Sequence, residues 1–133
     1  MKQILGFILF SSFVLASSIK WQHNFQEAYD LALQEKKPLF VFIERVDPPC
    51  RWCNKMKTTT LQDPKIIQFI NQHFIAVRLD RDTSSYPGNL FPKYVPTIYV
   101  IQRKKVIKRI IGYWSKKDFW SDLEDIKRTL HLK

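Results

Sequence analysis

Cysteine and glycine are scarce in this 133-residue chain, which has two cysteines and three glycines. So few glycines argue against a loop-rich scaffold. A content of 45% hydrophobic and 14% aromatic residues excludes a disordered chain. No apolar run reaches the roughly 20 residues that a membrane-spanning helix needs. A chain of this length is expected to form one domain with its own hydrophobic core.

The N-terminal segment has the layout of an export signal. Lys2 gives it a positive start, the stretch 4–16 is mainly apolar, and small residues follow at 16–18. This order is typical of a cleaved secretory signal, and an uncleaved anchor is the alternative. We therefore expect a cleaved signal over residues 1–18 and a single domain over residues 19–133. The protein is expected to be periplasmic or otherwise exported, and its mature form soluble and monomeric.

Acidic residues are few relative to basic ones, and the net charge is +10. The basic residues are dispersed, with local density at 103–105, 108–109 and 116–117. Because export is expected, we expect no nucleic-acid partner. A solvated basic surface is the simpler interpretation, and docking to an acidic partner or an anionic membrane surface is the alternative.

Hydrophobic periodicity predicts interleaved helices and strands. Asn24, Asp63 and Ser115 are the expected helix caps, and a tight hairpin across Arg103 and Lys104 lacks the favoured Asn-Gly turn. The element order predicts an α/β fold with a central mixed sheet and helices on both faces. The expected helices cover 24–35, 50–60, 64–73 and 115–130, and the expected strands cover 39–43, 74–79, 97–101 and 106–111.

The two cysteines, Cys50 and Cys53, are three positions apart, between a predicted strand and a predicted helix. A disulfide that closes so short a loop adds little stability, so redox chemistry or metal binding explains the pair better. At a helix start, unpaired N–H groups favour the thiolate, and Arg51 adds a positive charge. Thiolate is the form that attacks disulfides, so Cys50 is the expected nucleophile and Cys53 the expected resolving thiol.

Metal binding is the alternative for the same pair. Structural zinc usually needs four ligands, and the chain has no second C-x-x-C and only scattered histidines. Copper(I) fits better, because Cys50, Cys53 and Met56 are soft ligands at close spacing. Met56 also falls on a helical face where a core methionine is the ordinary outcome. No cofactor signature is present, and we expect neither a cofactor nor a resident metal.

Three segments together resemble the thioredoxin superfamily: 39–44, 50–53 and 95–97. The pattern C-x-W-C-x-x-M, which runs from Cys50 to Met56, is similar to that of exported thioredoxin-related proteins. The resemblance covers residues 21–130 and implies a thioredoxin-like fold with Pro96 as a cis proline beside the cysteines. It implies a thiol–disulfide oxidoreductase that reduces protein disulfides. A dithiol oxidant that forms disulfides is the alternative.

The resemblance also implies a role for an acid near the pair. Glu44 takes the place of a buried acid that assists proton transfer from the resolving cysteine, and Arg78 matches its basic partner. The alternative is that Glu44 is the exposed end of a strand. The chain departs from the family at Pro49, where a tryptophan is common.

Substrate contacts follow from the same resemblance. The backbone at Val95 and Pro96 is expected to pair with an extended substrate chain, next to the residues between the cysteines, Arg51 and Trp52. Trp52 either packs over the site or offers an apolar docking surface. The implied partners are protein thiols and disulfides, with a membrane thiol-electron transporter as the redox partner.

Overall fold

A five-stranded mixed sheet forms the centre of the computed structural model, which describes residues 6, 8 and 17–133. The strand order is β1-β3-β2-β4-β5. β1, β3 and β2 are parallel, whereas β4 is antiparallel to both of its neighbours. The α/β prediction is therefore confirmed. The strands are β1 (Trp21–Gln22), β2 (Leu39–Glu44), β3 (Ile75–Asp80), β4 (Thr97–Gln102) and β5 (Lys105–Ile111).

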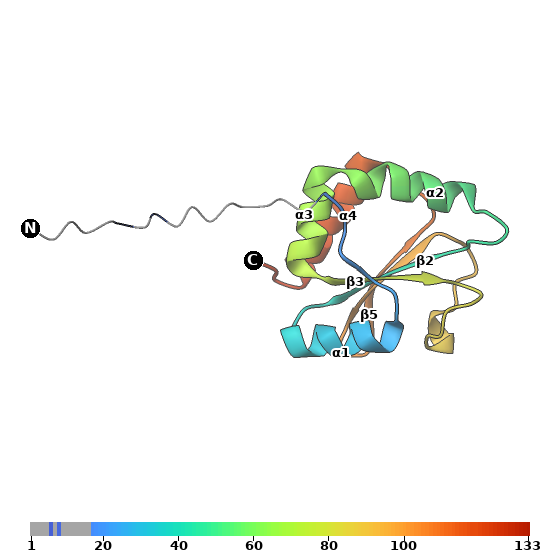
Figure 1. The fold of residues 1–133 in the computed structure, drawn as a ribbon, viewed down its shortest axis with the longest axis horizontal. Coiled ribbons are helices and arrows are strands. Elements are labelled where there is room, and N and C mark those ends of the chain that lie inside the picture. The colour runs from blue at the N-terminus through green and yellow to red at the C-terminus, as the bar shows by residue number, and fades with distance from the viewer. Residues whose placement is uncertain (1–5, 7, 9–16) are drawn as a thin grey trace, which may run out of the picture.

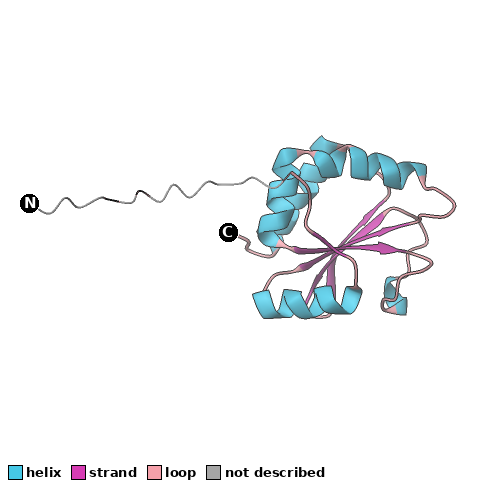
Figure 2. Cartoon of the chain, viewed as in Figure 1, coloured by secondary structure: helices cyan, strands magenta, loops and turns pink. Residues whose placement is uncertain are grey.

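Helices cover both faces of the sheet, as Figure 1 shows. Helix α1 lies alone on one face, and the other three helices lie together on the opposite face. Figure 2 shows the strands fanning out between these two helical layers. The helices are α1 (Phe25–Glu35), α2 (Arg51–Thr58), α3 (Pro64–His73) and α4 (Lys116–Thr129), with short 3-10 turns at η1 (Thr60–Gln62) and η2 (Gly88–Leu90).

Strand alternation divides the core into two clusters. Phe40 and Phe42 pack on the side of α2–α4, where Phe119 of α4 is fully buried. Val41 and Ile43 point to the α1 side. Every residue of β2 is buried, because a central strand covered on both faces exposes neither row of side chains. This buried strand ends directly before the loop that carries the cysteines.

The predicted helices and strands are present, with their ends shifted by one or two residues. Asn24, Asp63 and Ser115 accept the cap hydrogen bonds expected of them. The second helix ends at Thr58 instead of continuing to residue 60. The hydroxyls of Thr58 and Thr59 donate to carbonyls of the preceding turn, which competes with helix continuation.

One strand was not predicted. β1 is only two residues long, which is too short for any periodicity to reveal it. The Trp21 ring lies 6.1 Å from the Phe40 ring and 5.8 Å from the Phe42 ring, so this edge strand is held by aromatic packing as well as by pairing.

The predicted signal over residues 1–18 lies almost wholly outside the described residues. Within the part of the chain that the structure describes, no helix has the length and apolar character needed to cross a membrane.

Candidate active site

The cysteine pair lies where β2 gives way to α2. Cys50 is the N-cap of α2, and Cys53 lies in the first turn. Their side chains form a disulfide, with the two Cα atoms 5.2 Å apart. Cys50 is 5% exposed and Cys53 is 0% exposed, so both are buried and Cys50 is the one nearer the surface.

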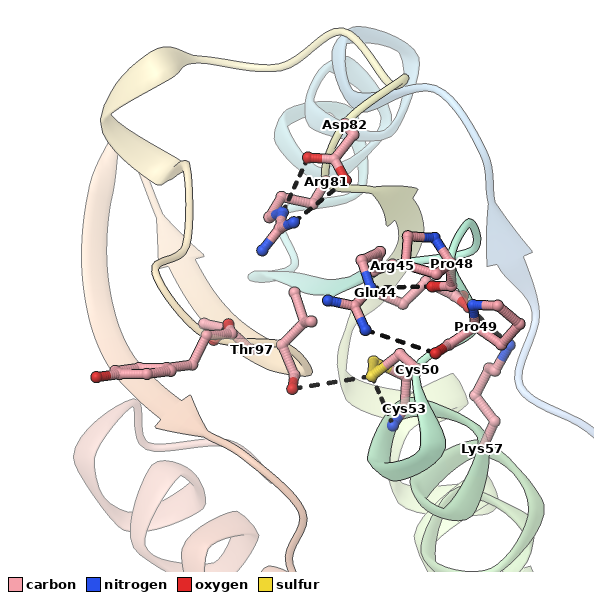
Figure 3. The surroundings of a disulfide bond; sticks show 12 residues. Glu44, Arg45, Pro48, Pro49, Cys50, Cys53, Lys57, Arg81, Asp82 and Thr97 are labelled. Atoms are coloured by element: carbon pink, nitrogen blue, oxygen red, sulfur yellow. Dashed lines mark hydrogen bonds and ion pairs between the residues drawn. A yellow bond between two sulfur atoms is a disulfide. The ribbon is translucent and has the colours of Figure 1, made fainter.

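The helix start supplies a hydrogen bond to the outer sulfur. The backbone N–H of Cys53 donates to Cys50 Sγ at 3.2 Å (Figure 3). The first turn of α2 contains no acidic residue that would oppose negative charge. When the pair is reduced, the same N–H and the positive end of the helix stabilise a thiolate at Cys50.

Arg45 holds the loop before the pair. Its side chain donates to the carbonyl oxygen of Pro48 at 2.9 Å and to that of Pro49 at 3.5 Å (Figure 3). The Asp47–Pro48 peptide bond is cis. Neither the hydrogen bonds of Arg45 nor the cis bond was predicted. The sequence shows the two prolines, but not which side chain bonds to their carbonyls or which isomer the loop adopts.

The Val95–Pro96 segment forms the other side of the site. The peptide bond between these residues is cis, and the Val95 carbonyl oxygen lies 3.9 Å from Cys50 Sγ. Gly112 N–H donates to the Pro96 carbonyl at 2.8 Å, and the Thr97 hydroxyl donates to the Tyr94 carbonyl at 2.6 Å. These bonds fix the segment beside the cysteines, although it is more than 40 positions away in sequence.

Glu44 ends β2 with its side chain buried rather than exposed. The residue is 3% exposed, so the exposed-end alternative is wrong. Lys57 Nζ lies 2.7 Å from Glu44 Oε1, and Arg78 Nε lies 3.3 Å from Oε2. Arg78 is the partner that the resemblance implied, and Lys57 was missed. Its position four residues after Cys53 places it on the same helix face, which is a signal that could have found it.

These three charged groups border a cavity of about 510 Å³. Asn54, the neighbour of Cys53, also lines it, whereas the lining includes neither cysteine. A space of this size can hold water that bonds to its charged walls. Its remaining lining residues are His23, Arg45, Val46, Pro49, Leu79, Asp80 and Ser84.

Trp52 faces solvent beside the disulfide. It is 47% exposed, and its ring lies 5.8 Å from that of Tyr113. Lys55 Nζ lies 5.3 Å from the Trp52 ring and 4.8 Å from the Tyr113 ring, and the Arg51 guanidinium lies 5.3 Å from Trp52. Cations over aromatic faces attract the ring and hold the indole in this position. Trp52 therefore offers an apolar surface instead of filling the core.

Other exposed apolar side chains lie at the same end of the sheet and were not predicted as part of the site. Tyr94 is 57% exposed and directly precedes Val95, and Ile111 is 50% exposed and pairs with Thr97. Val46, 57% exposed, follows β2. The sequence does not show that these residues share one surface, because they are far apart in the chain and only the fold brings them together.

Residues 10–100 match the sequence model of the family Thioredox_DsbH, described as a protein of unknown function, DUF255. The chain belongs to this family. Spermatogenesis-associated protein 20 is similar over 64 residues, with 34% identity for the protein of Mus musculus and 31% for that of Homo sapiens. The matched stretch is 48% of this chain and 8% of either relative, so the chain spans a small part of their length.

Solved structures show a thioredoxin-like fold. A thioredoxin from Thermus thermophilus superposes with a TM-score of 0.68 at 21% identity, over 82% of this chain and 87% of that one. A structure described as DsbH oxidoreductase gives 0.67 at 21% identity, over 90% and 89%. The oxidised C-terminal domain of Neisseria meningitidis DsbD gives 0.58 at 21% identity, over 75% and 90%. The Cys50–Cys53 pair on this fold supports a thiol–disulfide oxidoreductase.

Proposed function

We propose that this protein is an exported thiol–disulfide oxidoreductase that reduces protein disulfides. The observation that carries the proposal is the Cys50–Cys53 disulfide at the start of α2, with the outer sulfur 3.9 Å from the Val95 carbonyl. A sulfur at a helix N-terminus, nearer the surface than its fully buried partner, suits attack followed by resolution.

The reaction starts from the reduced pair. The Cys50 thiolate attacks one sulfur of a substrate disulfide, forms a mixed disulfide and releases the other substrate sulfur as a thiolate. Cys53 loses its proton and attacks Cys50 Sγ, which releases the second substrate thiolate. The substrate has gained two electrons, and the protein is left with the Cys50–Cys53 disulfide.

Glu44 is the proposed proton acceptor for Cys53. The carboxylate lies among Lys57 and Arg78 at the edge of the cavity, which also reaches Asn54. We propose that water in that cavity relays the proton between the helix that carries Cys53 and the Glu44 carboxylate. Glu44 is thus a positioning and proton-accepting group, whereas Cys50 and Cys53 form and break the bonds.

The substrate chain is proposed to pair with Val95. Proline has no N–H, and the Pro96 carbonyl already accepts from Gly112, so the backbone polar groups of Val95 remain for a substrate. Arg51 and Trp52, which lie between the two cysteines, contact the side chains of the substrate. Pro96 contributes by shaping the segment rather than by bonding.

Export and the electron source belong to the proposal. The signal-like sequence over residues 1–18 supports export, followed by a domain over residues 19–133. A membrane thiol-electron transporter is the proposed donor that reduces the Cys50–Cys53 disulfide again.

The reduction potential of the pair tests the direction of the reaction. We expect a value near about −270 mV when the protein is equilibrated in dithiothreitol or glutathione buffers, as for thioredoxin. A value near about −120 mV would make the protein an oxidant. Failure to form a reversible disulfide would remove the oxidoreductase proposal altogether.

Replacing Trp52 with alanine is expected to weaken substrate binding and to leave the chemical steps unchanged. Removing a half-exposed anchor of this kind costs about 1–2 kcal/mol, so KM for a protein disulfide should rise roughly 10-fold while kcat stays constant. Steady-state reduction of a disulfide-bonded protein measures both. Trp52→Phe should restore most of the loss, and an equal fall in kcat would show that Trp52 serves the chemistry or the fold instead.

Met56 distinguishes the oxidoreductase from the copper(I) alternative. Its side chain is fully buried in the core cluster with Phe40 and Phe42. Met56→Leu conserves volume, so we expect an unfolding free energy lowered by less than about 1.5 kcal/mol and disulfide exchange within about twofold of the parent. Denaturant unfolding and an exchange assay measure the two quantities. Stoichiometric copper(I) binding by the reduced protein that Met56→Leu abolishes would favour the metal instead.

A further inference from the structure

Several chain segments meet at the end of the sheet opposite the cysteines. α1 and α3 end just before β2 and β3 begin, and α4 runs back from the cysteine end to finish here. The β4–β5 turn lies here as well, because Ile101 pairs with Leu39, the first residue of β2. In Figure 1 the ends of α1, α3 and α4 lie on the left, and the loop that leads into α2 lies on the right.

This end is densely basic. Two carboxylates near the ends of α1 and α4 form ion pairs: Glu35 lies 3.8 Å from Lys37, and Asp125 pairs with Arg128. Burial, together with the charges of Lys127 and Lys37, lowers the pKa of His73. A lysine that follows α1 and a lysine of α4 therefore both lie near this histidine. We call the following residues the basic pole: Lys36, Lys37, Arg103, Lys104, Lys105, Lys127, Arg128 and Lys133; all are exposed except Lys37, which is half-buried.

Cations near helix C-termini have a structural explanation, because they balance the negative end of the helix dipole. That explanation covers Lys36, Lys127 and Arg128. It does not cover Arg103, Lys104 and Lys105, which lie in or next to a hairpin turn. The charge at this end therefore exceeds what helix capping requires.

Backbone conformation gives a second indication. Among the described residues, the non-glycine residues with positive φ are Lys36 (54°), Arg103 (50°), Lys104 (67°) and His131 (52°). All four lie at this end, and all are basic residue types. A two-residue hairpin turn with positive φ favours Asn-Gly, and an L-residue with a bulky side chain is strained there. These positions therefore carry positive charge where glycine or asparagine would suit the backbone better.

The N-terminal segment enters the domain at the same end. Lys20 N–H donates to Asn71 Oδ1 at 2.9 Å, and Asn71 Nδ2 donates to the Ser18 carbonyl at 3.0 Å. Asn71 lies in the last turn of α3. Residues 18–20 therefore lie beside the basic pole. Leu33, 52% exposed, adds an apolar side chain three residues before Lys36.

We propose that the basic pole docks on an anionic phospholipid surface. The cations come from several segments at one end of the molecule, with the exposed Leu33 among them, and this spread of charge suits an extended lipid headgroup layer. Each Lys or Arg near such a surface strengthens binding roughly fivefold. In this orientation Cys50 faces away from the membrane and stays accessible to protein substrates. The proposal does not depend on the direction of the redox reaction.

Two matched double variants test the docking surface. Arg103→Asn/Lys104→Gly removes two charges from the basic pole with residues that the turn favours. Lys116→Gln/Lys117→Gln removes two charges at the start of α4, at the cysteine end. The protein is used as recovered from cells, so any N-terminal contribution is common to all variants. Binding is measured on vesicles of phosphatidylcholine alone and of phosphatidylcholine mixed with phosphatidylglycerol.

We expect the parent protein to prefer the phosphatidylglycerol vesicles, and the turn variant to bind them roughly 10- to 30-fold more weakly. The Lys116/Lys117 variant should bind like the parent. The turn variant should also unfold at the same or a higher temperature, which separates lost binding from lost fold. Equal binding to both vesicle types, or an equal loss in both variants, would overturn the proposal, as would binding to polyglutamate without binding to vesicles.

Discussion

Cys53→Ser is expected to convert the protein into a covalent trap for its substrates. Cys50 retains its place at the start of α2 and still attacks, but no thiol remains to resolve the mixed disulfide. Turnover should fall by roughly 1,000-fold or more, while an adduct of protein and substrate accumulates. Non-reducing electrophoresis followed by mass spectrometry measures the adduct and identifies the proteins held in it.

Cys50→Ser is the matched control for the trap. Both variants lose the same disulfide and hence the same small stabilisation, so any difference between them reports chemistry. Cys53 is 0% exposed, and we expect no adduct when it is the only cysteine left. Adducts of similar yield in both variants would show that the assignment of nucleophile and resolving thiol is wrong.

Most of the fold could be predicted because its signals are local. A central strand buried on both faces reads as a continuous apolar run, as in β2, and the caps Asn24, Asp63 and Ser115 mark helix starts through side-chain bonds within three residues. β1 was missed because its two residues owe their strand conformation to β3 and to the aromatic rings beneath Trp21.

The site was predicted where its residues carry their own chemistry and missed where only packing defines their role. The spacing of Cys50 and Cys53 is enough to predict them as the reactive pair. Lys57 lies closer to Glu44 than the expected partner Arg78 does; its spacing from Cys53 places it on the right face of the helix, but only the fold brings it to the Glu44 carboxylate. Arg45 is similar, because its bonds to two proline carbonyls depend on how the loop turns back.

The same reasoning applies to the two ends of the molecule. Positive charge is spread along the sequence, and only the sheet topology shows which cations lie together. The β4–β5 pairing brings the 103–105 cluster to the end of α1, whereas Lys116 and Lys117 lie at the cysteine end. A total charge of +10 therefore does not by itself indicate a docking surface, but its arrangement does.

Glu44→Gln is expected to slow release of the mixed disulfide and to leave the first attack unchanged. Glutamine keeps the shape of the side chain but cannot accept a proton from Cys53. Loss of a positioned base typically costs about 10²–10⁴-fold; here, with water in the cavity as a substitute, we expect roughly 10- to 100-fold. Rapid-mixing measurements at neutral pH resolve formation and decay of the mixed disulfide as separate phases.

Lys57→Gln separates proton transfer from structural support. Both variants break the Glu44–Lys57 ion pair, so an effect of the pair on stability or on the position of α2 should appear equally in both. Lys57→Gln retains the carboxylate and its contact with Arg78, and its release step should stay within a few-fold of the parent. Equal slowing in the two variants, or an unchanged release rate in Glu44→Gln, would assign Glu44 to structure alone.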